Sequence, residues 1–95
     1  MKTTKPIEII HREQLGAILK TARENTDLTQ REISIYLGYS SAVYISRVES
    51  GRCAVSFEFL NKIIRLYKMN PEQLISLYTK QYREKLFDKL RKAGA

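Results

Sequence analysis

Histidine and cysteine are common in catalytic and metal sites, and this chain has one of each, His11 and Cys53. Nucleophilic catalysis needs a nucleophile, a base beside it and a third group that orients the base, and no such set is apparent. One histidine with one cysteine does not fit a zinc site or an internal disulfide. The four glycines are scattered and form no phosphate-binding loop. We therefore expect no enzymatic activity, no metal and no cofactor.

Both residues have a simpler interpretation. We expect His11 to be an exposed polar residue near the start of a helix. Cys53 follows Arg52 in a loop, where we expect a small, reduced side chain. A redox-sensing thiol is the alternative for Cys53.

The charge of the chain favours binding to an anionic partner. With 17 Lys and Arg against 10 Asp and Glu, the net charge is +7, which favours nucleic acid, then an acidic membrane surface or an acidic protein. Residues 79–95 hold six basic and two acidic residues, so they carry four of the seven excess charges. The longest uncharged stretch, from Ile33 to Ser46, is too short and polar to cross a bilayer, and no secretory signal is visible. We expect a reducing, bacterial-type cytoplasm and no membrane partner.

Helices must position any binding residues, because strand patterns are almost absent. Apolar residues at positions i, i+3, i+4 and i+7 predict a first helix from about residue 12 to Asn25. These residues are Leu15, Ile18, Leu19 and Ala22. Residues 1–11 stay open between a disordered arm, a short strand and an early start of this helix.

Two short helices are predicted next. Thr29 and Glu32 have the spacing of a capping box, and Gly38 can end the helix in a left-handed conformation. After a tight turn, Ser41 is favoured as the cap of a helix that runs to about Glu49. Two short helices joined in this way leave the second one half exposed, as in a helix-turn-helix. An exposed helix of this kind fits the major groove of DNA.

Two further helices complete the expected fold. One starts at Ser56 and the other at Asn70-Pro71, where Gln73 is expected to complete a second capping box. The 95 residues are therefore predicted to form one all-α domain of five helices.

The sequence resembles a known family at this point. The resemblance is carried by Leu28-Thr29-Gln30-Arg31-Glu32-Ile33, Leu37-Gly38-Tyr39-Ser40-Ser41 and Tyr44-Ile45-Ser46-Arg47-Val48-Glu49-Ser50-Gly51. These segments are similar to the lambda-repressor-like helix-turn-helix domain of the Cro/CI type, also called the XRE family of bacterial and phage transcriptional regulators. The resemblance implies a five-helix DNA-binding domain over residues 15–78, with the helix-turn-helix at about 29–49. Residues 1–14 are then an N-terminal arm or the start of the first helix, and residues 79–95 are a basic C-terminal helical extension.

The resemblance also implies a DNA-binding site. Gln30 matches a glutamine that contacts the DNA backbone and braces the recognition helix. Arg47 is the only charge on the exposed face of that helix and can bind guanine through O6 and N7. For Tyr44, packing and DNA contact are left as equal alternatives. The residues expected to contact DNA are Thr29, Gln30, Arg31, Ser40, Ser41, Ala42, Val43, Tyr44, Ser46, Arg47, Ser50 and Arg52.

Arg23 and Glu49 match a largely buried ion pair of the family, which ties the first helix to the end of the recognition helix. We expect this pair to be structural. The chain departs from the family pattern at Ser34, where alanine is usual, in the turn after Gly38, which is one residue longer, and at Ala42-Val43, where long polar side chains are common.

An apolar stripe continues past residue 78 to the end of the chain. It consists of Leu74, Tyr78, Tyr82, Leu86, Phe87 and Leu90. Such a helix can fold back on its own core or form a dimer interface, and we favour the dimer because one small module makes few contacts to a DNA site. The interleaved basic residues also suit a second DNA contact or a membrane surface.

Together these features predict a sequence-specific double-stranded DNA-binding transcriptional regulator. It is expected to act as a repressor or activator by occupying a palindromic operator as a homodimer. The alternative is an antitoxin, or another protein whose C-terminal helix binds a protein partner, with DNA binding used for autoregulation.

Overall fold

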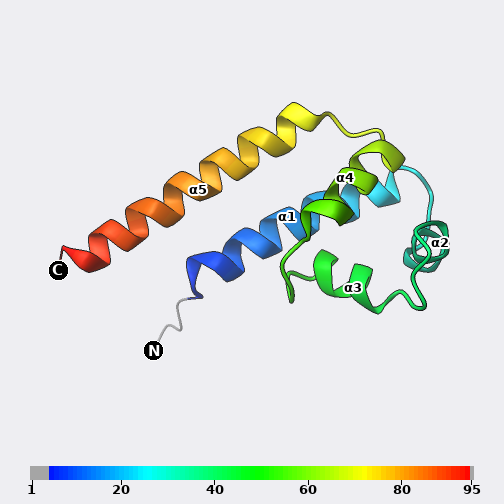
Figure 1. Cartoon of the computed structure of the whole chain (residues 1–95), viewed down its shortest axis with the longest axis horizontal. Helices are drawn as coiled ribbons and strands as arrows, with labels where there is room; N and C mark the ends of the chain where they lie inside the picture. The colour runs from blue at the N-terminus through cyan, green and yellow to red at the C-terminus, as the bar shows by residue number, and fades with distance from the viewer. Residues whose placement is uncertain (1–4, 95) are drawn as a thin grey trace.

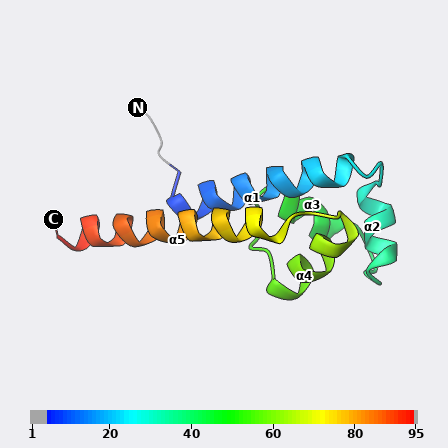
Figure 2. The same cartoon turned by 90° about the horizontal axis from the view of Figure 1, so that it is seen from above.

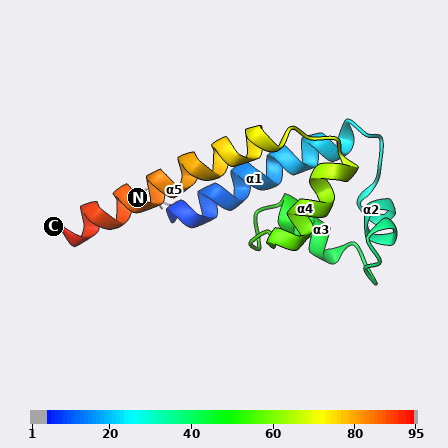
Figure 3. The same cartoon turned by 45° about the horizontal axis from the view of Figure 1, so that its top comes forward.

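The computed structural model describes residues 5–94, and these residues form five helices and no strand. The helices are α1 (Ile7–Glu24), α2 (Gln30–Tyr36), α3 (Val43–Glu49), α4 (Phe57–Leu66) and α5 (Pro71–Ala93). The short helices α2, α3 and α4 gather around the carboxyl-terminal half of α1 (Figure 1). The long helix α5 runs back antiparallel beside α1 in all three views and extends past the start of α1 (Figures 2 and 3). The all-α prediction is confirmed.

The first helix starts earlier than its periodicity predicted. Pro6 is the cap residue of α1, with an extended ψ of 145°, and the helix begins at Ile7 rather than near residue 12. The fixed φ of proline suits a helix start, and Glu8 lies in the first turn, where an acidic side chain is favoured. Residues 7–11 are therefore an early start of the first helix, whereas residues 1–4 lie outside the described part of the chain.

The capping box of α2 is present as predicted. The Thr29 hydroxyl accepts a hydrogen bond from the backbone N–H of Glu32 at 3.1 Å, and the Glu32 carboxylate accepts one from the backbone N–H of Thr29 at 3.0 Å. The hydrogen bond from the Thr29 backbone lowers the pKa of Glu32. Gly38 follows the helix with a φ of +79°, the left-handed conformation in which glycine is favoured.

The cap of α3 differs from the prediction. Ala42 is the cap residue, α3 begins at Val43, and no side-chain cap is formed. The Ser41 hydroxyl does accept a hydrogen bond from the backbone N–H of Val43, at 3.3 Å. The turn extends through Ala42, so Ser41 lies one residue before the cap position and its hydroxyl reaches only the first N–H of the helix.

The starts of α4 and α5 agree with the sequence in all but one detail. Ser56 caps α4 by accepting from the backbone N–H of Phe59 at 3.1 Å. Asn70 caps α5, and Pro71 is the first helical residue. The Asn70 side chain accepts from the backbone N–H of Glu72, at 2.9 Å, and not from that of Gln73, as a capping box would require. Gln73 donates its own backbone N–H to the Asn70 carbonyl, so the second capping box is not formed.

The core draws on all five helices. Its buried apolar residues are Leu15, Leu19, Ile33, Ile45, Val48, Phe59, Leu60, Ile63, Tyr67 and Leu74. Ile18 lies at the edge of the predicted α1 stripe and is 40% exposed. Within residues 5–94, no helix combines the length and apolar character needed to cross a membrane. The core fixes the inner side of α3 and leaves its outer side open.

Candidate nucleic-acid interface

Helix α3 is fastened at its carboxyl end by a buried ion pair. Arg23 of α1 donates from Nε to one Glu49 oxygen at 2.7 Å and from one terminal nitrogen to the other oxygen at 3.0 Å. Its other terminal nitrogen donates to the Leu28 carbonyl at 2.7 Å. The hydrogen bond to Glu49 raises the pKa of Arg23. The structure thus contains the ion pair that the family resemblance implies.

The same carboxylate also holds the first residue of α2. Gln30 donates from its side-chain amide to Glu49 Oε1 at 2.9 Å. Glu49 belongs to α3 and accepts hydrogen bonds from Arg23 of α1 and from Gln30 of α2. Helices α1, α2 and α3 therefore meet at this one side chain. A buried charge with several donors is held in one geometry, so the angle between α2 and α3 is fixed before any ligand binds.

Helix α1 approaches the end of α3 more closely than an ordinary side chain permits. A Cβ atom on Gly16 would lie 2.3 Å from the Val48 carbonyl oxygen and 2.7 Å from that of Glu49. Gly51, with a φ of +77°, faces Glu13 in the same way, because a Cβ there would lie 2.6 Å from the Glu13 side chain. Two glycines thus let the backbones of α1 and the end of α3 come into contact.

The outer face of α3 carries the side chains that remain available. Val43 is 52% exposed, and Ser46, Arg47 and Ser50 are also exposed, whereas Ile45 on the inner face is buried. Arg47 takes part in none of the ion pairs found among residues 5–94. One cation between small polar and apolar groups suits the edges of base pairs, which offer acceptors and the thymine methyl group.

The other predicted contact residues lie around this face. Thr29 and Arg31 at the start of α2, Ser40 and Ser41 in the turn, and Arg52 after α3 are exposed. Ala42 is half-buried, as is Gln30, whose amide is bound to Glu49. The predicted site residues therefore lie at the start of α2, in the turn, on α3 and just after it, and all but the inward-packing Tyr44 are exposed or half-buried surface residues.

Tyr44 packs inward and connects α3 to α4. Its hydroxyl accepts a hydrogen bond from the backbone N–H of Ser56 at 3.1 Å. Its ring stands edge-on to Phe59, with ring centroids 5.0 Å apart, and edge-on to Tyr39 at 5.8 Å. Of the two alternatives left open for Tyr44, this geometry matches packing. The sequence offered no signal that Ser56 is its partner.

His11 and Cys53 lie away from the outer face of α3. His11 is buried, at 8% exposure, and its Nε2 lies 2.9 Å from Glu84 Oε2 on α5, so the prediction of an exposed histidine is wrong. It is buried because α1 starts at residue 7 and α5 covers this part of it. Cys53 is a half-buried free thiol. Gly16 was also missed, although a lone glycine within a helical pattern is a recognised sign of close packing.

Comparison with known proteins agrees with this geometry. A helix-turn-helix domain family matches residues 14–77. The structure is also similar to that of the clp gene regulator ClgR from Corynebacterium glutamicum, with a TM-score of 0.62 and 27% sequence identity over 87% of this chain and 88% of that chain. No curated protein sequence matches significantly. Since the family match spans well over half of the chain, this protein belongs to the helix-turn-helix domain family.

Proposed function

We propose that this protein is a sequence-specific double-stranded DNA-binding transcriptional regulator that places α3 in the major groove. The observation that carries the proposal is the division of α3 into two faces. Ile45 and Val48 are 1% exposed and Glu49 is held by three hydrogen bonds, while Arg47 and its neighbours on the outer face are open. Membership of a helix-turn-helix family and similarity to a gene regulator support the same function.

The proposed contacts fall into two classes. Arg47 binds a guanine edge, and Val43 and Ser46 contact the neighbouring base pairs. Phosphates are bound by the flanking side chains, which position α3 but carry no sequence information. These flanking residues are Thr29, Gln30, Arg31, Ser40, Ser41, Ser50 and Arg52. Tyr44 acts through its hydrogen bond to Ser56, which sets the position of the first turn of α3.

We further propose that the protein binds as a homodimer. One seven-residue recognition helix spans about 10 Å and covers few base pairs, so a second copy is needed to specify a site. A two-fold dimer places two such helices about 34 Å apart, in successive major grooves on one face of a palindromic operator. Bound there, the protein regulates transcription in the cytoplasm by blocking or assisting polymerase.

One observation favours a second candidate function. The outer face of α5 exposes several large apolar residues, among them Tyr82 at 68% and Leu90 at 59%. In an antitoxin-like protein, this face binds a different protein, and DNA binding serves autoregulation. The two functions predict different states of the purified protein alone in solution. A second copy covers α5 if the protein is a homodimer, whereas this face of α5 stays uncovered if its partner is a different protein.

Selection of bound duplexes from a random DNA pool at physiological salt tests the proposal. We expect enrichment of a palindrome with half-sites about 10 base pairs apart. The matched control is Arg47→Ala, which removes the one cation of the outer face and is expected to lose preference at one base pair in each half-site. Binding that shows no enriched sequence and only weakens steeply as salt rises would instead indicate contacts to phosphates alone.

A further inference from the structure

The distal half of α5 turns a polar face toward α1. Gln81 donates from its side-chain amide to the His11 carbonyl at 3.1 Å, and Glu84 lies 2.9 Å from the His11 ring. Lys85 lies 3.0 Å from the Glu8 carboxylate, and this hydrogen bond lowers the pKa of Glu8. Beyond Leu77, these polar contacts hold α5 to α1, and Tyr78 and Tyr82 line the rim of a hollow that α5 shares with His11 and Arg12 of α1.

The large exposed apolar residues of α5 form a stripe that borders this polar face. The stripe consists of Ile75 (63% exposed), Tyr78 (40%), Tyr82 (68%), Leu86 (46%) and Leu90 (59%). Their spacing of three or four residues keeps them on one side of the helix. A contiguous apolar surface of this kind is uncommon on a monomer and marks an interaction site.

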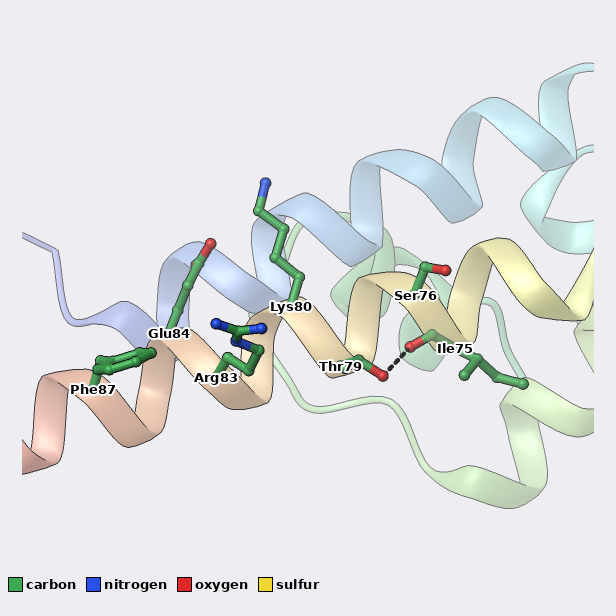
Figure 4. A pocket seen from close by; sticks show the side chains of 7 residues that line it. All are labelled: Ile75, Ser76, Thr79, Lys80, Arg83, Glu84 and Phe87. Atoms are coloured by element: carbon green, nitrogen blue, oxygen red, sulfur yellow. Dashed lines mark hydrogen bonds between the residues drawn. The ribbon is translucent and has the colours of Figure 1, made fainter.

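Two further depressions border the stripe. On the side of α4, an apolar hollow of about 520 Å³ is lined by side chains from α4, from the loop before it and from the start of α5. The lining residues include Val55, Phe57, Leu60, Leu74 and Tyr78. On the other side, a groove formed by α5 alone runs from Ile75 past Arg83 to Phe87 (Figure 4). A ridge beside an apolar hollow can pack into an identical surface, as a two-fold interface requires.

We propose that two copies of this chain pair through α5 in antiparallel orientation, centred on Tyr82. This inference rests on the proposed homodimer and specifies its interface. About such an axis, a residue n positions before Tyr82 faces the residue n positions after Tyr82 of the other copy. Leu86 then faces Tyr78 of the other copy and Leu90 faces Leu74, so the distal stripe of each chain covers the apolar hollow of its partner.

The charges of α5 select this orientation over a parallel one. Residues 71–79 carry a single charge, that of Glu72, whereas residues 80–93 hold six basic and two acidic residues, a net charge of +4. Parallel pairing places +4 beside +4. Antiparallel pairing centred on Tyr82 instead places residues 85–93, with a net charge of +3, beside residues 71–79, with −1, and does so twice; only residues 80–84, with a net charge of +1, then face their own copy. Like charges held a few ångströms apart repel even at the protein surface, which favours antiparallel pairing. The same repulsion disfavours a basic partner protein as the occupant.

Disulfide cross-linking tests both the occupant and the orientation. In a Cys53→Ser background, four chains are prepared: Tyr78→Cys, Tyr82→Cys, Leu86→Cys and Leu90→Cys, with circular dichroism as the check that each is folded. The two copies of position 82 face each other across the proposed axis, so Tyr82→Cys should form a disulfide-linked dimer without a second variant. Tyr78→Cys and Leu86→Cys, co-refolded as chains of different mass, should give the mixed disulfide, while each alone should remain uncross-linked. Leu90→Cys alone should not cross-link, because the two copies of position 90 lie about 24 Å apart along the helices.

Each other outcome overturns the proposal. Cross-linking of Leu90→Cys alone would establish a parallel pair. Absence of cross-links at all four positions, in a protein that still selects a palindrome, would place the dimer interface elsewhere and leave the proposed function intact. Absence of cross-links together with a monomeric mass in sedimentation and no palindrome would contradict the homodimer as well.

Discussion

The substitution Gly16→Ala provides the sharpest test of the α1–α3 contact. In an ordinary helix interior, replacing glycine by alanine stabilises by about 1 kcal/mol. At Gly16 the new Cβ would lie 2.3 Å from the Val48 carbonyl oxygen, 2.7 Å from the Glu49 carbonyl oxygen and 2.9 Å from the Glu49 carbonyl carbon. All three neighbours are backbone atoms, so no side-chain rotation can relieve the clash.

The expected magnitude follows from the movement that the new methyl group requires. A carbon-to-oxygen contact of about 3.2 Å requires the end of α3 to move by almost 1 Å, an overpacking that costs about 1–3 kcal/mol. The same movement stretches the Arg23–Glu49 hydrogen bonds, now 2.7 and 3.0 Å long. Complete rupture of a buried pair costs about 3–5 kcal/mol, and a partial loss adds about 1–2. After the gain in helix propensity of about 1 kcal/mol, we expect Gly16→Ala to destabilise by about 1–4 kcal/mol.

Urea unfolding followed by circular dichroism measures this difference. Ala17→Gly is the matched control, because Ala17 is exposed on the same helix and reports the helix-propensity difference alone, with an expected loss of about 1 kcal/mol. If Gly16→Ala proved neutral or stabilising while the control behaved as expected, the close approach of α1 to α3 would be refuted.

Three further outcomes are expected. Arg47→Ala should weaken binding to the selected operator by about 1–3 kcal/mol in a gel-shift titration, with unchanged urea unfolding because the side chain is exposed; unaltered affinity would remove Arg47 from base recognition. Thr29→Ala should lower the free energy of unfolding by about 1 kcal/mol, since it removes the hydroxyl that accepts from Glu32, and an unchanged urea midpoint would contradict the cap. Burial raises the pKa of Tyr67 to about 12, so the folded state favours the neutral phenol and stability should fall as pH rises from about 10 to about 12. In urea titrations between these pH values, the free energy of unfolding of Tyr67→Phe should fall by about 1–2 kcal/mol less than that of the unaltered protein. Identical losses in both proteins would refute the raised pKa of Tyr67.

Most helices could be predicted because their signals are local. The Thr29–Glu32 box, Ser56 and Asn70-Pro71 each mark a helix start within four residues, and the structure has a helix at each of them. The start of α1 was left open among three alternatives, one of them an early helix start, because Ile9 and Ile10 do not continue the helical period of the residues that follow. This part of α1 packs against α5 through His11, whose partners come about 70 residues later in the chain.

Tertiary contacts were accessible only where a family pattern supplied them. Arg23 and Glu49 could be paired from the resemblance, and the structure forms that pair. His11 and Glu84 are 73 residues apart in the sequence, and no local pattern around either residue predicts that they are in contact. Tyr44 and Ser56 likewise meet through the packing of α3 against α4, which depends on the shapes of both helices and not on spacing along one of them.

The two faces of α3 have a consequence for altering which DNA the protein binds. Ile45, Val48 and Glu49 carry the stability of the helix, whereas Val43 and Arg47 project away from the protein and contribute little to it. Under the proposed function, sequence preference and folding are assigned to different side chains of the same seven-residue segment. The proposal then implies that the outer positions can be exchanged for those of another regulator, so that operator choice is reprogrammed without rebuilding the domain.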